Sequence, residues 1–194
     1  MRVAIVKYKG GNTVSVSNAL ARIGADPVVT DSPEAIAAAD RVIIPGVGEA
    51  STAMSSLREA GLCDAIRDLE QPVLGICLGM QLLCARSEEN DTEGLGILPN
   101  RVLRFRGTDL KVPHTGWNTV EDLSSDLFDG IYEGAHMYFV HSYYVESGDT
   151  DIGTTSYGLR FASAIARDNF YGVQFHPEKS GEPGERLLQN FLTL

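Results

Sequence analysis

The sequence predicts an α/β fold in which helices cover a mostly parallel central sheet and the second half of the chain is richer in antiparallel strands. Three observations predict this fold. Short apolar runs alternate with helical patterns through the first half of the chain. These runs are apolar throughout, which is typical of parallel strands buried on both faces. In the second half, strand candidates follow one another across polar turns.

The first half supplies four predicted strands, at residues 3–6, 28–29, 42–44 and 73–76. Glycine and proline mark where strands end. The first strand stops at the turn cluster Tyr8-Lys9-Gly10-Gly11-Asn12, and the third stops at Pro45-Gly46-Val47-Gly48. The fourth strand runs directly into Cys77.

Helical patterns separate these strands. The first helix is predicted to carry Val14, Leu20, Ala21 and Ile23 on one side and to stop at Gly24. The segment Asp31-Ser32-Pro33-Glu34 is typical of a helix start with proline in the first turn. Further helices are predicted over residues 50–60, 63–69 and 78–85.

The second half supplies strand candidates at residues 102–103, 138–140, 143–145 and 163–166. Asp168-Asn169 predicts a hairpin turn that leads into a strand over residues 171–175. A last helix over residues 185–192 places Leu187, Leu188, Phe191 and Leu192 on one face. Because no repeat, low-complexity tract or linker interrupts the pattern, we expect a single domain over residues 1–194.

Composition narrows the function. The chain has 194 residues, 43% hydrophobic and 22% charged, which is close to globular averages and argues against wholesale disorder. Its 16 basic and 26 acidic residues give a net charge of −10. Nucleic-acid binding is not expected, because affinity for a phosphate backbone comes from lysine and arginine. Membrane insertion is not expected either, since the apolar runs are shorter than a membrane helix needs.

The three cysteines, Cys63, Cys77 and Cys84, are an odd number in a chain whose start does not look like a signal peptide. We therefore expect a cytoplasmic protein with free thiols that are either buried or catalytic.

The sharpest local signal is Gly75-Ile76-Cys77-Leu78-Gly79, a G-x-C-x-G run between a strand and a helix. This pattern is the nucleophile elbow with sulfur in place of the serine oxygen. Small flanking residues allow a tight turn, and the following helix directs its N-terminus and the Leu78 N–H at the sulfur. The alternative is a buried cysteine without chemistry, which is the assignment we give to Cys63 and Cys84.

A cysteine nucleophile needs a base, and His176-Pro177-Glu178 supplies a candidate. In an extended chain, residues two apart face the same side, so Glu178 is predicted to orient His176. A surface His–Glu pair is the plainer alternative.

The segment Pro45-Gly46-Val47-Gly48 ends a strand with two glycines around one residue. Such a peptide can turn an N–H into a site, as an oxyanion hole requires. An ordinary strand-to-helix turn is an equal alternative, and the sequence leaves open which way the N–H points.

These three segments, in this order, resemble the class I (triad) glutamine amidotransferases over essentially the whole chain. Within that family the chain is most similar to the glutaminase subunits of imidazole glycerol phosphate synthases, which act in histidine biosynthesis. The resemblance rests on the elbow, on Pro45-Gly46-Val47-Gly48 and on Gln174-Phe175-His176-Pro177-Glu178-Lys179-Ser180-Gly181. It also rests on His114…Gly116-Trp117-Asn118 and on Tyr138-Phe139-Val140-His141-Ser142-Tyr143. It implies the family's flavodoxin-like fold.

The resemblance implies a Cys77, His176 and Glu178 triad that hydrolyses glutamine through a thioester, with no cofactor and no metal. It implies an oxyanion hole from Val47, Gly48 and Leu78. The implied glutamine contacts are Gly48, Gln81, Glu89, His141, Ser142 and Tyr143. Glu88 is adjacent to Glu89, and the sequence leaves open which of the two faces the site.

The resemblance also implies a partner, a (β/α)₈-barrel cyclase that forms a heterodimer with the glutaminase and uses its ammonia. The positions that match this interface are Asn12, Trp117, Asn118, Tyr138 and Lys179. Trp117 could instead be a core ring. Other open alternatives are a triad glutaminase for anthranilate, guanylate or pyridoxal phosphate synthesis, a stand-alone cysteine hydrolase, and a flavodoxin-like binding domain with an inert Cys77.

Overall fold

A computed structural model of the chain describes residues 1–107 and 110–194. Its α-helices are α1 (Thr13–Arg22), α2 (Pro33–Ala37), α3 (Ala50–Glu59), α4 (Leu62–Arg67), α5 (Leu78–Leu83) and α6 (Gly181–Thr193). Short 3₁₀ turns are η1 (Glu89–Asp91), η2 (Asp126–Phe128) and η3 (Pro177–Lys179). The strands are β1 (Val3–Val6), β2 (Pro27–Thr30), β3 (Arg41–Gly46), β4 (Val73–Cys77), β5 (Cys84–Ser87), β6 (Thr92–Glu93), β7 (Leu98–Arg104), β8 (His114–Val120), β9 (Ala135–His141), β10 (Tyr143–Val145), β11 (Asp151–Tyr157), β12 (Leu159–Arg167) and β13 (Phe170–Val173).

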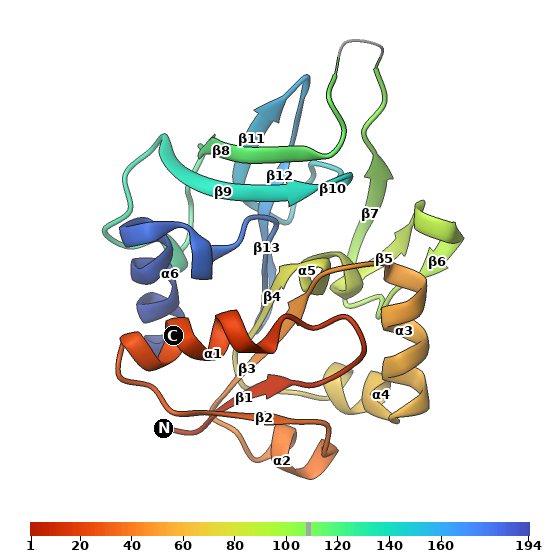
Figure 1. The fold of residues 1–194 in the computed structure, drawn as a ribbon, viewed down its shortest axis with the longest axis vertical. Coiled ribbons are helices and arrows are strands. Elements are labelled where there is room, and N and C mark those ends of the chain that lie inside the picture. The colour runs from red at the N-terminus through yellow and green to blue at the C-terminus, as the bar shows by residue number, and fades with distance from the viewer. Residues whose placement is uncertain (108–109) are drawn as a thin grey trace.

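One large mixed sheet runs through the molecule in the strand order β2-β1-β3-β4-β13-β12-β10-β7-β5-β6, with β11 beside β12 (Figure 1). Its first five strands pair in parallel, from β2 through β13. Beyond β13 the pairing becomes mainly antiparallel, and β8 and β9 form a separate antiparallel pair. The predicted α/β fold, with a parallel centre and an antiparallel second half, is confirmed.

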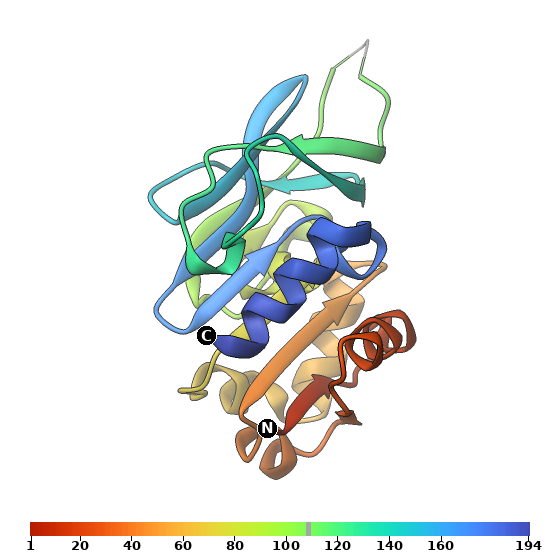
Figure 2. The ribbon, with the colours of Figure 1, turned by 90° about the vertical axis from the view of Figure 1, so that its left-hand side faces the viewer.

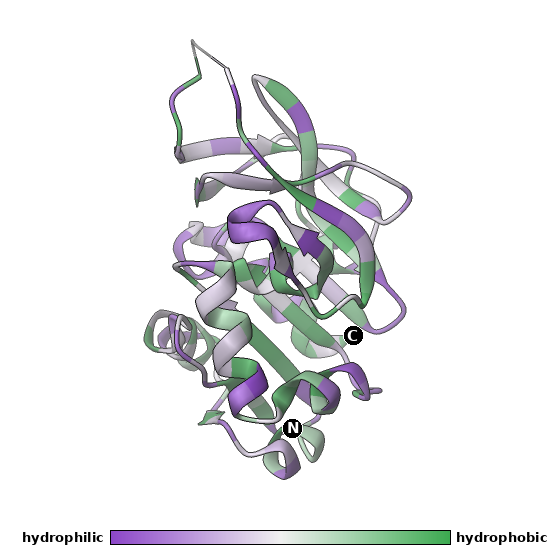
Figure 3. Cartoon of the chain, turned by 90° about the vertical axis from the view of Figure 1, so that its right-hand side faces the viewer, coloured by the Kyte–Doolittle hydropathy of each residue, from purple (hydrophilic) through white to green (hydrophobic). Residues whose placement is uncertain are grey.

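Helices cover both faces of the parallel strands, which is why those strands are apolar throughout. In β1, Val3 and Ile5 pack in the cluster that contains the buried residues of α1 and α6. Ala4 and Val6 point the other way, into the cluster formed with α2, α3 and α4. Figure 2 shows α6 lying across the strands on one side, and Figure 3 shows the hydrophobic strands behind α3 on the other.

Most predicted elements are present, and the predicted Asp168-Asn169 hairpin joins β12 to β13. Strands β8 and β11 were not predicted. Both include polar and glycine-rich stretches, His114-Thr115-Gly116 and Gly153-Thr154-Thr155, that lack an apolar signature. No helix within the described residues is long and apolar enough to cross a membrane.

Two helix predictions were wrong in detail. The buried side of α1 is formed by Val16, Ala19 and Leu20, whereas Val14 is 68% exposed. Val14 is six residues before Leu20, which places it about 120° around the helix. The predicted helix over residues 78–85 ends at Leu83, because Cys84 pairs with Leu98 as the start of β5.

The first turn of α5 lies unusually close to β3 and β4. A Cβ added to Gly79 would be 1.9 Å from the Ile44 carbonyl oxygen, and one added to Gly75 would be 2.7 Å from the backbone of Gly79. These contacts leave no space for a side chain. Glycines on both sides of Cys77 are therefore required for α5 to start directly above the end of β4.

We expect Gly79→Ala to lower the free energy of unfolding by about 3 kcal/mol or more, because the new methyl group would collide with a strand carbonyl that cannot move. Urea denaturation measures the change. Gly148→Ala is the matched control, since its added Cβ would have only the Asn100 side chain nearby, at 3.9 Å. Equal stability of the two variants would contradict the close approach.

Candidate active site

Three neighbouring parallel strands end at the same edge of the sheet and deliver the three predicted segments together. Gly46 at the end of β3 pairs with Cys77 at the end of β4, and Ile76 pairs with Val173 at the end of β13. The carboxyl ends of parallel strands are the usual place for sites in open α/β sheets. His176 lies three residues beyond Val173, so the sheet itself brings it close to Cys77 across a long sequence separation.

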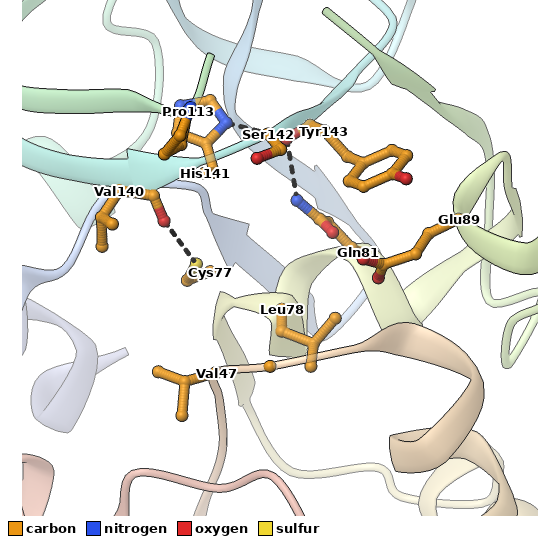
Figure 4. A pocket seen from close by; sticks show the side chains of 11 residues that line it. Val47, Cys77, Leu78, Gln81, Glu89, Pro113, Val140, His141, Ser142 and Tyr143 are labelled. Carbon is orange, nitrogen blue, oxygen red and sulfur yellow. Dashed lines mark hydrogen bonds between the residues drawn. The ribbon is translucent and has the colours of Figure 1, made fainter.

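Cys77 occupies a strained backbone conformation between β4 and α5, with φ 54° and ψ −108°. A positive φ is uncommon for a residue with a side chain, and its strain is typical of a nucleophile elbow. The side chain is buried. Its Sγ lies 3.9 Å from the Val140 carbonyl oxygen, as Figure 4 shows, and accepts a hydrogen bond from the Gln174 side-chain amide at 3.6 Å.

His176 and Glu178 are both buried and joined by a hydrogen bond of 2.8 Å between Nδ1 and Oε1. The extended geometry predicted for this pair was wrong, because Pro177–Lys179 forms the 3₁₀ turn η3. A carboxylate only accepts, so Nδ1 carries the proton of this bond. Burial by itself would lower the pKa of His176, but its interaction with the nearby Cys77 sulfur and its hydrogen bond to the Glu178 carboxylate raise that pKa above its ordinary value.

The sulfur lies at one end of a pocket of about 330 Å³, within the size range of small-ligand sites. Figure 4 shows its lining from β4, α5, η1 and the β9–β10 junction. The pocket contains all the residues that the resemblance places around the oxyanion or the substrate: Val47, Gly48, Leu78, Gln81, Glu89, His141, Ser142 and Tyr143. Pro113 and Val140, which sequence reasoning did not single out, complete the wall.

Glu89 lines this pocket and Glu88 does not, which decides between the two adjacent carboxylates. Glu88 accepts from the Arg104 backbone N–H at 2.8 Å and pairs with Arg106. Glu89 accepts from the Ala50 backbone N–H at 2.7 Å, at the start of α3. Burial raises the pKa of Glu89, although this hydrogen bond opposes the shift. A cation in the pocket would stabilise the charged carboxylate.

The Val47 backbone N–H points away from the pocket. It donates to the Gly10 carbonyl oxygen at 2.6 Å, and the Tyr8 hydroxyl donates to the Pro45 carbonyl of the same segment. Val47 can therefore supply an oxyanion donor only after its peptide rotates. That peptide joins Gly46 to Val47, and Gly46 has no side chain to oppose the rotation. Gly48, with φ 98° and open space around its Cα, gives the same freedom to the next peptide, which carries the Gly48 N–H. The Leu78 N–H, at the start of α5, has no partner within that helix.

The residues expected at a partner interface form an exposed aromatic and basic group. Trp117 is 57% exposed and packs edge-on against Tyr138 at 6.0 Å between ring centroids, so it is not a core ring. The Lys179 Nζ lies 5.9 Å from the centre of the Tyr138 ring. Asn12 lies partly exposed at the start of α1, and Asn118 on β8 donates inward to the Ser156 carbonyl.

A buried histidine pair, whose contact the sequence did not reveal, connects this group to the pocket. His114 Nδ1 lies 2.9 Å from His141 Nε2, and His141 Nδ1 lies 2.8 Å from the Tyr143 carbonyl oxygen. The carbonyl can only accept, so His141 carries its proton on Nδ1 and its Nε2 accepts from His114. The Asn118 amide then donates to the remaining nitrogen of His114. Both rings are therefore neutral, and every hydrogen bond of the chain donates in the same direction, from Asn118 towards the Tyr143 carbonyl.

Within residues 1–107 and 110–194, no group of three or more histidine, cysteine, aspartate or glutamate side chains could hold a metal ion. The chemistry that the arrangement itself supports is attack by a thiolate on a carbonyl carbon. His176 can act as the general base for the sulfur. The pocket that contains the sulfur is lined by carboxylate, amide and backbone groups.

We expect the free energy of unfolding to fall as the pH decreases from 6.5 to 5.5. Burial lowers the pKa of His114 to about 4 and that of His141 to about 3, whereas both are near 6.5 in the unfolded chain. For these two rings only the unfolded state binds protons in this range, so each contributes a loss approaching about 1.4 kcal/mol per pH unit, which the raised pKa of His176 offsets in part. Chemical denaturation at several pH values measures the slope. In His114→Phe, which keeps a ring against Tyr157, the slope should fall to about half, and an unchanged slope would contradict the neutral pair.

The fold is shared with solved structures of glutamine amidotransferase type. A putative GMP synthase protein from Thermoplasma acidophilum matches with a TM-score of 0.78 at 19% identity, over 100% of this chain and 92% of that chain. PurLQS from Thermotoga maritima matches with a TM-score of 0.74 at 19% identity, over 99% of this chain and 97% of that one. At these identities the likeness shows the fold alone.

Sequence relatives are much more similar. The chain is 53% identical to the imidazole glycerol phosphate synthase subunit HisH of Bacteroides fragilis and 47% identical to that of Escherichia coli, with full coverage of both chains in each case. Residues 5–194 match the family model of the class-I glutamine amidotransferases. This chain therefore belongs to the class-I glutamine amidotransferase family, as its first resemblance indicated.

Proposed function

We propose that this chain is the glutaminase subunit of an imidazole glycerol phosphate synthase, and that it hydrolyses glutamine to glutamate and ammonia. The observation that carries the proposal is that β4 and β13 end side by side and bring Cys77 within interaction range of His176 of the His176–Glu178 pair, beside a pocket of ligand size. The full-length relatives at about 50% identity support the specific assignment. We further propose that residues 1–194 act as one domain in the cytoplasm.

In the proposed reaction, His176 draws the proton from Cys77, and the thiolate attacks the side-chain amide carbon of glutamine. The resulting oxyanion is held by the Leu78 N–H and by an N–H of the Val47–Gly48 segment. The C–N bond breaks as His176 returns its proton to nitrogen, so that ammonia and a thioester form. Water, activated by His176, then cleaves the thioester to glutamate and free Cys77. Glu178 holds the ring in the required orientation.

The pocket supplies groups for both ends of the amino acid. Glu89, a partly buried carboxylate, is suited to the substrate's α-ammonium group. The segment His141, Ser142 and Tyr143 presents backbone groups for the α-carboxylate. Gln81 and Gly48 line the same pocket.

We propose that the ammonia passes to a (β/α)₈-barrel cyclase partner in a heterodimer. Trp117, Tyr138 and Lys179 form the exposed group that supports docking, with Asn12 and Asn118 as further contacts, since exposed tryptophan and tyrosine are enriched at interface hot spots. The barrel would make imidazole glycerol phosphate and aminoimidazole carboxamide ribotide. The net charge of −10 agrees with phosphate binding by the partner rather than by this chain.

Cys77→Ala should reduce glutamine-dependent synthesis by the complex more than about a thousandfold, because the variant has no nucleophile. Synthesis from added ammonium salts should be unchanged, since ammonia enters after the glutaminase step. Product formation with each nitrogen source measures both. Cys63→Ala is the matched control, as Cys63 is a half-exposed thiol outside the pocket. Normal glutamine-dependent turnover by Cys77→Ala would refute the mechanism.

Glutamine hydrolysis should increase about a hundredfold when the barrel partner and its nucleotide are added. In the free chain the Val47 N–H is bonded to Gly10 and one oxyanion donor is missing. Glutamate release with and without partner measures this. Full activity of the isolated chain would instead favour a stand-alone cysteine hydrolase.

A further inference from the structure

Gln174 is a buried polar residue that the proposed mechanism does not use. It follows β13 directly, while Cys77 ends the adjacent strand β4, so the pairing of Val173 with Ile76 places the two residues side by side. The Gln174 side chain is fully shielded from solvent. Its Nε2 lies 3.6 Å from the Cys77 Sγ.

We propose that Gln174 is a further residue of the active site, whose amide N–H binds the Cys77 sulfur and stabilises its thiolate form. This inference rests on the proposed function, because it concerns the nucleophile of that reaction. It assigns a task to a side chain in direct contact with the reacting atom.

The direction of the Gln174 amide is fixed by its neighbours. The Gln81 side-chain nitrogen lies 3.0 Å from the Tyr143 carbonyl oxygen, which can only accept, so this atom must be the donor. The same nitrogen lies 2.9 Å from the Gln174 side chain, which must therefore present its oxygen there. The Gln174 nitrogen is left facing the sulfur. A flipped amide would place two N–H groups against each other.

A donor at this position favours the charged form of the sulfur. A thiolate that is buried away from water gains more from an N–H than a neutral thiol does. The Val140 carbonyl, 3.9 Å from Sγ, interacts favourably only with the thiol form. Gln174, which follows the neighbouring strand β13, offsets this preference for the thiol form.

None of the titratable groups near the Cys77 sulfur keeps a proton available to the thiolate through the whole reaction, whereas the neutral Gln174 amide does. His176 interacts with Sγ from beyond β13, and Tyr8 interacts with it from the turn after β1. His141 faces the same pocket as a neutral ring. His176 carries a proton in only part of the cycle, since it passes that proton to the leaving nitrogen. Gln174 keeps its N–H throughout, including the step in which the thioester breaks and the thiolate is the leaving group.

Two variants test this contact. Gln174→Glu has nearly the same shape and still accepts from Gln81, but it replaces the donor with a carboxylate. Gln174→Met removes the donor without adding charge and fills a similar volume. Ser163→Ala is the matched control, because it removes a buried hydroxyl without a hydrogen-bond partner on the strand next to Gln174.

The readout is the pH dependence of alkylation of Cys77 by iodoacetamide in the complete chain, followed by peptide mass spectrometry. In Gln174→Met the midpoint should rise by about one pH unit, which lowers the alkylation rate at pH 7 about tenfold. In Gln174→Glu it should rise further. Ser163→Ala should match the native protein, and Cys63 in the same digests should keep its profile in every variant. In the complex, kcat should fall about tenfold with KM changed less than about twofold.

An unchanged Cys77 midpoint in both Gln174 variants would overturn the inference while leaving the proposed glutaminase intact. A native Cys77 that resists alkylation across the whole pH range would instead overturn the proposed function, so the two failures are distinguishable. Because alkylation needs neither glutamine nor partner, the result does not depend on substrate binding. A folding defect would also alter the Cys63 profile.

Discussion

The close approach of α5 to the ends of β3 and β4 is the constraint on which the rest of the structure depends. Gly79 lies directly on the Ile44 carbonyl, and Gly75 lies under the Gly79 backbone. With the helix this near, the chain has no room for a gradual turn, and Cys77 takes a positive φ. The strain is compensated by the well-packed apolar layers on both faces of the sheet. It lifts the sulfur to the sheet edge, where other strands also end.

Parallel strand pairing then brings most of the active-site residues together. A register that joins Val173 to Ile76 brings Gln174 and His176 to Cys77 without help from the loop between them. The site places four polar side chains where water is largely excluded, and such groups are costly unless they are hydrogen-bonded. The Gln81–Gln174 and His176–Glu178 bonds meet part of that requirement, and their geometry fixes which atom of each group donates. Among the described residues, His176 Nε2 and Glu178 Oε2 are buried without a hydrogen-bond partner.

The β8–β9 pair and the turn after β1 connect the pocket with the molecular surface. One route runs from half-buried Asn118, the neighbour of exposed Trp117 on β8, through the two buried histidines to the Tyr143 carbonyl, which also accepts a hydrogen bond from the Gln81 amide. Another runs from the Gly10 turn to the Val47 peptide. Both join surface positions to groups that line the pocket. A partner that contacts these positions would therefore be linked to the pocket by hydrogen bonds.

The sequence by itself determined the elements and the local chemistry. Apolar runs identified β1, β3 and β4, and the glycines around Cys77 identified the elbow, because these signals arise within a few residues. It gave the wrong buried side for α1, where Val14 faces solvent, because periodicity does not show what packs against a helix. It missed β8 and β11, because these segments lack an apolar pattern of their own and form strands by pairing with β9 and β12.

Only the tertiary structure decided the contacts between distant segments. It placed Glu89 rather than Glu88 in the pocket, because the Arg104 backbone and Arg106 hold Glu88 elsewhere. It turned the Val47 N–H towards Gly10, a choice that depends on a separate loop. Gln174 could have been noticed from sequence, since it lies two residues before His176, within the strand predicted over residues 171–175. The donor role of its amide follows only from the positions of Gln81 and Tyr143, because hydrogen-bond direction is set by partners that the chain brings together in three dimensions.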